Sequence, residues 1–84
     1  MRFAATVEVQ LRPGIADPEG ATIDKAIAAL GIAGVSEVRA GRCFRFTVEA
    51  EDLASAEEVA DSLGERLLSN PVIERHLTTI EALG

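Results

Sequence analysis

Apolar and polar residues alternate along the first part of the chain. Between residues 3 and 12 the apolar residues of one parity are Phe3, Ala5, Val7, Val9 and Leu11, and polar residues dominate the other parity. A period of two over ten residues is typical of a β-strand with one buried face. Pro13 and Gly14 end this strand, because proline lacks a backbone donor and glycine permits a turn.

Apolar residues then recur at helical spacing. Asp17 followed by Pro18 is the pattern of an N-cap and a first helical residue. The apolar stripe of Ile23, Ile27 and Leu30 predicts a helix from about Pro18 to Leu30. Gly31 suits the left-handed position that often follows a helix end.

A second helix is predicted before Asn70 and Pro71, where the proline stops it. It begins near Asp52, or near Ser55, which has the spacing of a capping box with Glu58. The residues expected on its buried stripe are Ala56, Val59, Ala60, Leu63 and Leu67.

A long extended stretch, Val35 to Ala50, separates the two helices and is interrupted by Gly41. The apolar residues on one parity of this stretch are Val38, Ala40, Phe44, Phe46, Val48 and Ala50. A three-residue hairpin loop at Gly41-Arg42-Cys43 keeps that parity, and it pairs Ala40 with Phe44 and Val38 with Phe46. A single long strand bent at Gly41 is the alternative.

The last segment, Val72 to Leu83, predicts a strand of poor alternation, at a sheet edge or partly disordered. The element order is therefore β-α-β-β-α-β. It favours an α+β, ferredoxin-like two-layer sandwich, an antiparallel sheet with two helices on one face. With 84 residues, the chain is expected to be a single domain, residues 1–84.

A net charge of −6 argues against nucleic-acid and membrane-surface binding, which usually need a basic face. The segment from Gly41 to Val48 loosely resembles the aromatic strand of an RNA-recognition motif. Its Phe44 and Phe46 share the core parity, however, so they are expected to face the helices. The longest uncharged stretch, Ala26 to Ser36, is too short to span a bilayer. A lone cysteine and no recognisable targeting segment favour the cytoplasm.

Candidate catalytic and metal-binding residues are few. Cys43 and His76 form a nucleophile and base only if the fold brings them together. Glu74 and His76 share one face of the last predicted strand, but two ligands are fewer than a metal site needs. The carboxylates at Glu49, Glu51, Asp52, Glu57 and Glu58 suit a helix start and solubility better than acid-base chemistry. We therefore expect no catalytic residue, no metal and no cofactor.

The connection from Arg12 to Gly20 is rich in proline and glycine but is no phosphate loop, because it lacks the Lys-Ser/Thr ending. Gly20 is unusual in a first helical turn, where it costs roughly 1 kcal/mol relative to alanine. An ordinary turn leading into a helix explains most of the segment. A close backbone contact at Gly20 is the other interpretation.

Three arginines, Arg39, Arg42 and Arg45, lie within seven residues that contain no acid. Arg39 and Arg45 have the parity opposite to the core, and Arg42 is at the predicted loop. Arginine is favoured at interfaces because its planar fork binds carboxylates in a bidentate manner. The cluster is either a partner contact or a solvated face, and the pattern favours neither.

Three motifs, in order and at the right spacing, resemble the PurS family, the small subunit of phosphoribosylformylglycinamidine synthase. They are the segments from Leu11 to Gly20, from Val38 to Arg42 and from Leu67 to Glu74. The resemblance implies a usually dimeric subunit, without catalytic residues, that acts in de novo purine biosynthesis. It joins a glutaminase subunit, which releases ammonia, to a large ATP-dependent synthetase subunit.

The expected partners are thus a second copy, as a homodimer or a dimer of dimers, and the two larger subunits. Our hypothesis for the partner interface is the three arginines with Asn70 and Pro71 of the third motif. The alternative function is a free-standing regulatory domain that binds a small molecule on a ferredoxin-like sheet.

Overall fold

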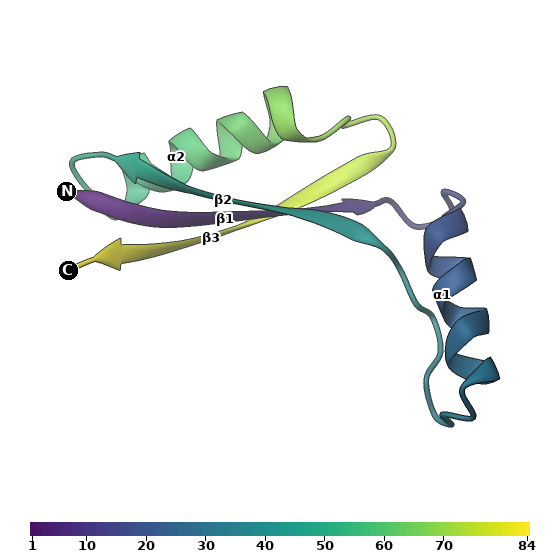
Figure 1. Cartoon of the computed structure of the whole chain (residues 1–84). Helices are drawn as coiled ribbons and strands as arrows, with labels where there is room; N and C mark the ends of the chain where they lie inside the picture. Colours follow the sequence, from purple (N-terminus) through teal and green to yellow (C-terminus); the bar gives the residue numbers. More distant parts are fainter.

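A computed structural model describes residues 1–84 as a three-stranded sheet, a helix that covers it and a helix that projects from it (Figure 1). The elements are β1 (Arg2–Leu11), α1 (Pro18–Ala29), β2 (Gly41–Glu49), α2 (Leu53–Leu63), a π-helical turn η1 (Gly64–Leu68) and β3 (Glu74–Leu83). The strand order is β2-β1-β3, and both pairings are antiparallel. The predicted α+β class with an antiparallel sheet is confirmed.

The core lies between β1 and α2. Phe3, Ala5, Val7 and Val9 of β1 are at most 1% exposed, as their alternation predicts. On α2 the fully buried residues are Ala56 and Ala60. Their small side chains let α2 approach the sheet closely, so α2 excludes water from the apolar face of β1 without contributing large side chains.

Local capping signals predict both helix starts. The Asp17 carboxylate caps α1 by accepting the backbone N–H of Gly20. Asp52 caps α2 in the same manner by accepting the N–H of Ser55, so Ser55 is a donor to the cap and not the cap itself. Gly31 follows α1 with a φ of 76°, in the left-handed region expected for it.

The predicted stripe of the second helix is only partly correct. Val59 is 45% exposed and Leu67 is 73% exposed, while Leu68 packs against the core. The change from Leu67 to Leu68 is caused by η1, where the Ser69 N–H donates to the Gly64 carbonyl five residues earlier; Val59 lies before η1, in α2. A π-helical turn holds more residues than an α-helical one, so the inward position moves from residue 67 to residue 68.

The predicted hairpin at Gly41 does not form. Gly41 is the first residue of β2, which pairs Phe46 with Ala5 and Phe44 with Val7 of β1. The expected pairings of Ala40 with Phe44 and of Val38 with Phe46 are therefore wrong, and the chain runs on without reversing (Figure 1). Both interpretations preserve the same parity, so the pattern alone does not distinguish them. Gly41 is needed because a Cβ there would lie 2.6 Å from the Val9 carbonyl oxygen.

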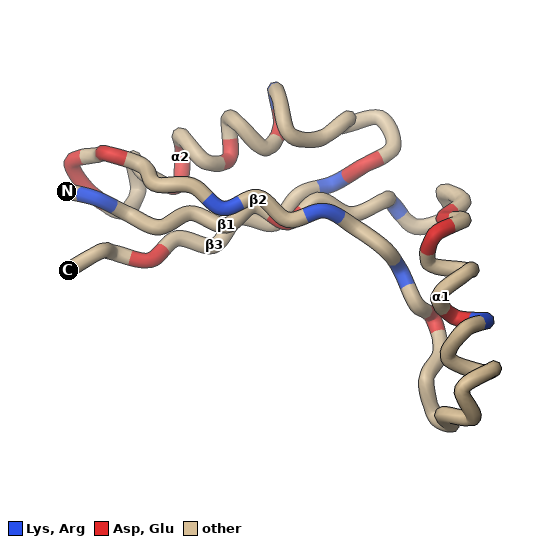
Figure 2. Tube along the Cα trace, viewed as in Figure 1, with Lys and Arg blue, Asp and Glu red and all other residues tan.

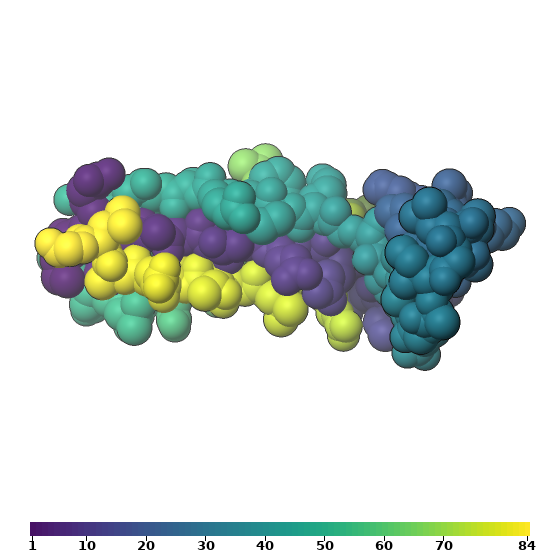
Figure 3. All heavy atoms as spheres, turned by 60° about the horizontal axis from the view of Figure 1, so that its bottom comes forward, coloured from purple at the N-terminus to yellow at the C-terminus, as the bar shows by residue number.

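The position of α1 also differs from the expectation that both helices cover one face. α2 covers the sheet, whereas α1 projects beyond its end (Figure 1) and forms a separate lobe in the space-filling view (Figure 3). On α1 and the turn that follows, Ile23 is 42% and Leu30 is 74% exposed. Apolar periodicity predicts that a helix buries one face, but not which surface buries it.

The last strand is fully ordered as a sheet edge. β3 pairs with β1 from Glu74 to Leu83, and its C-terminal end lies beside the start of β1. No helix of the chain has the length and apolar character that a bilayer crossing requires.

Candidate interaction surfaces

Cys43 and His76 lie on opposite faces of the sheet. On β1, Glu8 is the partner of Cys43 and Val9 is the partner of His76, so the two residues differ in parity. They also belong to the two outer strands, about 10 Å apart across β1. Cys43 is exposed on the face that α2 leaves open. A nucleophile and base are therefore not assembled from this pair.

His76 instead contacts α2. Its Nε2 lies 3.3 Å from the Asp61 carboxylate, which also accepts a hydrogen bond from the Thr78 hydroxyl. The ring lies against Gly64, where a Cβ would approach it to 2.6 Å. Glu74 and His76 do share a face of β3, but no three His, Cys, Asp or Glu side chains gather into a metal-binding group.

The Asn70-Pro71 segment forms a tight turn between η1 and β3. Its carbonyl at Asn70 accepts the N–H groups of Ile73 and Glu74, and the Pro71 carbonyl accepts the Arg12 Nε–H. The Asn70 N–H donates to the Glu74 carboxylate at 2.7 Å. This backbone donor, and then Arg42, lower the pKa of Glu74. The turn is held from several directions and presents Val72, which is 81% exposed.

The three arginines do not project as one cluster. Arg42 shares the parity of Phe44, on the face of α2, and donates to Glu74 at 3.0 Å and to the Leu68 carbonyl at 3.2 Å. Arg39 donates to main-chain carbonyls of the loop before α1. Only Arg45 is exposed on the open face without a hydrogen-bond or ion-pair partner in the chain. The strand at Gly41, in place of a loop, puts Arg42 on the core parity.

Charge is divided unevenly between the layers (Figure 2). The stretch from residue 46 to residue 65, which includes α2, contains seven of the fourteen acidic residues and no Lys or Arg. These acids are Glu49, Glu51, Asp52, Glu57, Glu58, Asp61 and Glu65. The rest of the chain is nearly neutral, so the net charge of the molecule resides in this stretch, mostly on α2 and the turn before it.

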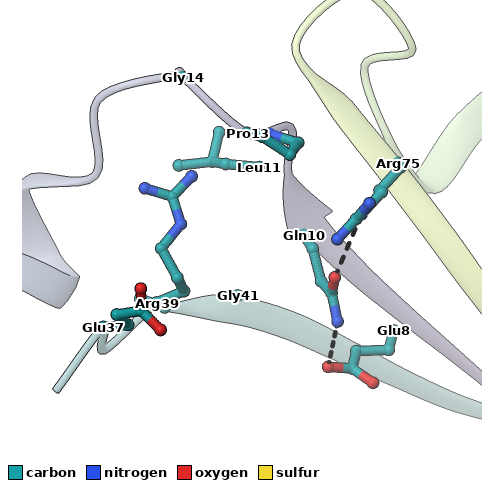
Figure 4. A pocket seen from close by; sticks show the side chains of 10 residues that line it. Glu8, Gln10, Leu11, Pro13, Gly14, Glu37, Arg39, Gly41 and Arg75 are labelled. Atoms are coloured by element: carbon teal, nitrogen blue, oxygen red, sulfur yellow. Dashed lines mark hydrogen bonds between the residues drawn. The ribbon is translucent and has the colours of Figure 1, made fainter.

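A cleft of about 610 Å³ separates the end of β1 from the segment that leads into β2 (Figure 4). Arg75 donates to the Gln10 side chain, which in turn donates to Glu8, and Arg39 and Glu37 face them from the other wall. Small-molecule sites are usually concave and largely apolar. This cleft is open, and four of its ten lining residues are charged, so it does not favour a free-standing ligand-binding domain.

Comparison with known protein families gives a match to one family over residues 4–82. That family is PurS, described as phosphoribosylformylglycinamidine (FGAM) synthase. A PurS subunit of phosphoribosylformylglycinamidine synthase from Synechocystis is 40% identical over 81 residues, which is 96% of this chain and 81% of that protein. A subunit of the same name from Mycobacterium leprae is 42% identical over 78 residues, 93% of this chain and 95% of that protein.

Solved structures share the fold over nearly the same range. PurS from Thermus thermophilus superimposes with a TM-score of 0.90 at 36% identity and covers 100% of both chains. A chain in the structure of PurLQS from Thermotoga maritima has a TM-score of 0.88 at 31% identity, over 96% of this chain and 99% of that one. The projecting α1 is therefore included in the shared architecture.

Proposed function

Because the chain belongs to the PurS family of phosphoribosylformylglycinamidine synthase subunits, we propose that it is the small, non-catalytic subunit of that enzyme. In this role it joins a glutaminase subunit to an ATP-dependent synthetase subunit during purine biosynthesis. The match over residues 4–82 carries the proposal, and the similarity to a chain of PurLQS supports the assembly.

The reaction requires that ammonia pass from one active site to the other, and a joining subunit would hold these two sites together. Ammonia released by a glutaminase becomes protonated in water and loses its nucleophilic lone pair, so the two active sites have to be coupled in an enclosed assembly. The sheet separates Cys43 from His76. Ser69 shares a small cleft with His76, but its hydroxyl donates to the Gly64 carbonyl and His76 contacts Asp61. In the proposed role the chain contributes surfaces and not a reacting group.

Self-association is part of the proposed function. The radius of gyration is 16.2 Å, whereas a compact chain of this length has about 12 Å. The excess comes from α1, whose apolar residues lack cover. Over the sheet, α2 lies mainly on β1 and β3, and Phe44 and Phe46 of β2 remain half-buried. Each copy therefore has a helix, α1, that no sheet covers, and an outer strand, β2, that α2 covers only in part. A second copy would supply the missing cover in both places.

The segment before β2 offers a further contact to the second copy. Residues 33–39 run between α1 and β2 and form no backbone–backbone hydrogen bond. The segment is not a continuous strand, because Gly34 and Glu37 have positive φ values of 84° and 57°, but its unpaired backbone groups remain available to another chain. Pairing across a two-fold axis would satisfy both copies at once, so the domain, residues 1–84, would be completed in the dimer.

For the larger subunits, we propose contacts at Arg45 and at the turn of Asn70 and Pro71. Of the three arginines considered, Arg45 alone has no partner in its own chain, and the turn is exposed and held by hydrogen bonds. Arg39 and Arg42 act indirectly, because each is engaged by its own chain. The assembly is expected in the cytoplasm, where the exposed Cys43 thiol stays reduced.

Reconstitution with the cognate glutaminase and synthetase tests the joining role. The two larger proteins should copurify when this chain is added and should separate without it. Glutamine-dependent synthesis of the amidine should need this chain. Synthesis from added ammonium salt should need it less, because free ammonia bypasses the glutaminase. Equal dependence of both activities, or copurification without this chain, would contradict the proposal.

Sedimentation equilibrium of an α1 variant tests self-association. Ile23→Asp places a charge on the exposed apolar face of α1 and should shift the chain towards the monomer. Leu67→Asp is the matched control, since Leu67 is an exposed aliphatic residue of η1, away from that face. A wild-type chain that is monomeric at micromolar concentration would contradict the proposed dimer, as would equal effects of both variants.

A further inference from the structure

We call the projecting helix α1 the arm. Both oxygens of the Asp17 carboxylate accept backbone N–H groups at the start of this arm. One oxygen of Asp17 accepts the Gly20 N–H at 3.0 Å, which caps α1. The other oxygen accepts the N–H of Ala40, immediately before β2, at 2.7 Å. The start of α1 is thereby tied to a residue 23 positions later in the chain. These two N–H groups, and then the charge of Arg39, lower the pKa of Asp17.

Arg39, the residue before Ala40, connects the same two segments, but here the side chain is the donor and the backbone is the acceptor. The guanidinium of Arg39 donates to the Ile15 carbonyl at 3.1 Å and to the Arg12 carbonyl at 3.3 Å. Donors of a planar fork are thus matched to two carbonyls of the loop between β1 and α1. Arg39 and Ala40 together hold the loop through one side chain and one backbone group.

Gly20 leaves the space that this arrangement requires. It is the buried residue of α1, and a Cβ there would overlap the Asp17 carboxylate and lie 2.7 Å from the Val38 carbonyl oxygen. Gly20 does not have a positive φ, so the requirement is for space and not for an unusual conformation. This close approach accounts for a glycine in a first helical turn.

We propose that Asp17, Gly20 and Arg39 form a clasp that fixes the direction of the α1 arm before a second copy binds. The inference rests on the proposed self-association and assigns positioning residues to it. Apart from its two connections to the sheet, α1 makes no substantial contact with the rest of the chain. Fixing its direction in advance lowers the entropy lost on association, so the clasp should strengthen the dimer.

The clasp is separable from the stability of the sheet. The buried core consists of residues from β1, β2 and α2, and none of the clasp residues belongs to it. Loosening the clasp should therefore change the orientation of α1 and the dimer affinity, while the sheet and α2 remain folded. A merely structural residue would instead lower the thermal stability of the whole chain.

Asp17→Ser separates capping from clasping. Serine is a good N-cap and keeps a bond to the Gly20 N–H, but it is too short to reach the Ala40 N–H as well. We expect roughly tenfold weaker dimerisation by sedimentation equilibrium, with preserved circular dichroism. Asp52→Ser is the matched control, because Asp52 caps α2 through Ser55 without a second segment to hold. It should leave the dissociation constant within about twofold.

Spin labels report the arm itself. Ala29→Cys on α1 and Thr47→Cys on β2, in a Cys43→Ser background, give one distance within each chain, measured at a dilution below the dimer dissociation constant so that no second copy holds α1. The distribution should be narrow with Asp17 and broad with Asp17→Ser. Gly20→Ala should broaden it as well. Unchanged dimerisation, or an equally narrow distribution, in Asp17→Ser overturns the clasp. A wild-type chain that never dimerises overturns the proposed self-association, and with it the role given to the clasp.

Discussion

Arg42 of β2 reaches over β1 to Glu74 at the start of β3, with its Nη2 3.0 Å from both carboxylate oxygens. The same nitrogen donates to the Leu68 carbonyl, and the guanidinium lies 5.6 Å from the centre of the Phe44 ring. One side chain therefore connects both outer strands and η1, on the face where α2 packs.

Arg42→Ala should destabilise the fold by about 1 kcal/mol, a value reduced because the side chain is half exposed. Arg45→Ala is the control, since Arg45 is free in the chain, and it should change the free energy of unfolding by less than about 0.5 kcal/mol. Urea denaturation of both variants gives the comparison. Equal losses would show that the contact of Arg42 with Glu74 contributes nothing specific.

Acid should remove a stabilising contribution of Glu74. The N–H of Asn70 and the charge of Arg42 lower the pKa of Glu74 from its ordinary value of 4.5. A lowered pKa in the folded chain means that stabilisation is complete above the unfolded value and disappears as the pH falls through the folded value. The melting temperature of Glu74→Gln should therefore lie below that of the wild type at pH 7, with a gap that narrows as the pH falls below the ordinary value of 4.5.

Glu81→Gln is the control for this titration, because Glu81 is an exposed carboxylate of the same strand without a hydrogen-bond partner in the chain. It should show no comparable gap at pH 7. A gap for Glu74→Gln that persists unchanged to pH 3 would mean that the loss arises from packing and not from charge.

Gly64→Ala should destabilise the chain by about 1–3 kcal/mol, because its Cβ would overlap the ring of His76. His76→Ala removes the obstacle, so Gly64→Ala in that background should cost clearly less. A double-mutant cycle by thermal or urea unfolding measures this coupling. Strictly additive effects would contradict the steric explanation.

Arg45→Glu should weaken the assembly with the larger subunits, most at low salt where screening is least. Glutamine-dependent synthesis should fall more than ammonia-dependent synthesis. Arg66→Glu makes the same charge change on η1, in the layer of α2, and is the control. If Arg45→Glu leaves both assembly and the glutamine-dependent rate unchanged, Arg45 belongs to a solvated face.

Elements defined by local signals were predictable from the sequence. The alternation of β1 identifies its buried face, and Asp17 and Asp52 mark the helix starts, because each signal acts within a few residues. The turn at Asn70 and Pro71 is found for the same reason. These features need no knowledge of the rest of the fold.

Features that depend on distant contacts were not predictable. Gly41 is compatible with a hairpin or a continuous strand, whereas in the structure β2 begins at Gly41, beside the carbonyl of Val9 on the neighbouring strand. The shift from Leu67 to Leu68 depends on η1, which packs beside β3. The sequence shows that α1 has an apolar face, but the exposure of that face depends on the direction in which α1 leaves the sheet. For the candidate site, the predicted hairpin placed Arg42 at a loop, whereas Arg42 lies in β2 opposite Val9, on the core parity.

The central position of β1 has a consequence for how the chain is made. β1 is synthesised first, yet its neighbour β3 is the last element of the sheet in chain order, and Arg2 pairs with Leu83. Until β3 leaves the ribosome, β1 keeps one edge unpaired, and α2 lacks its contacts with β3. Such long-range pairing slows folding and leaves an aggregation-prone edge during synthesis. Translation in the presence of a nascent-chain chaperone should therefore raise the yield of folded protein.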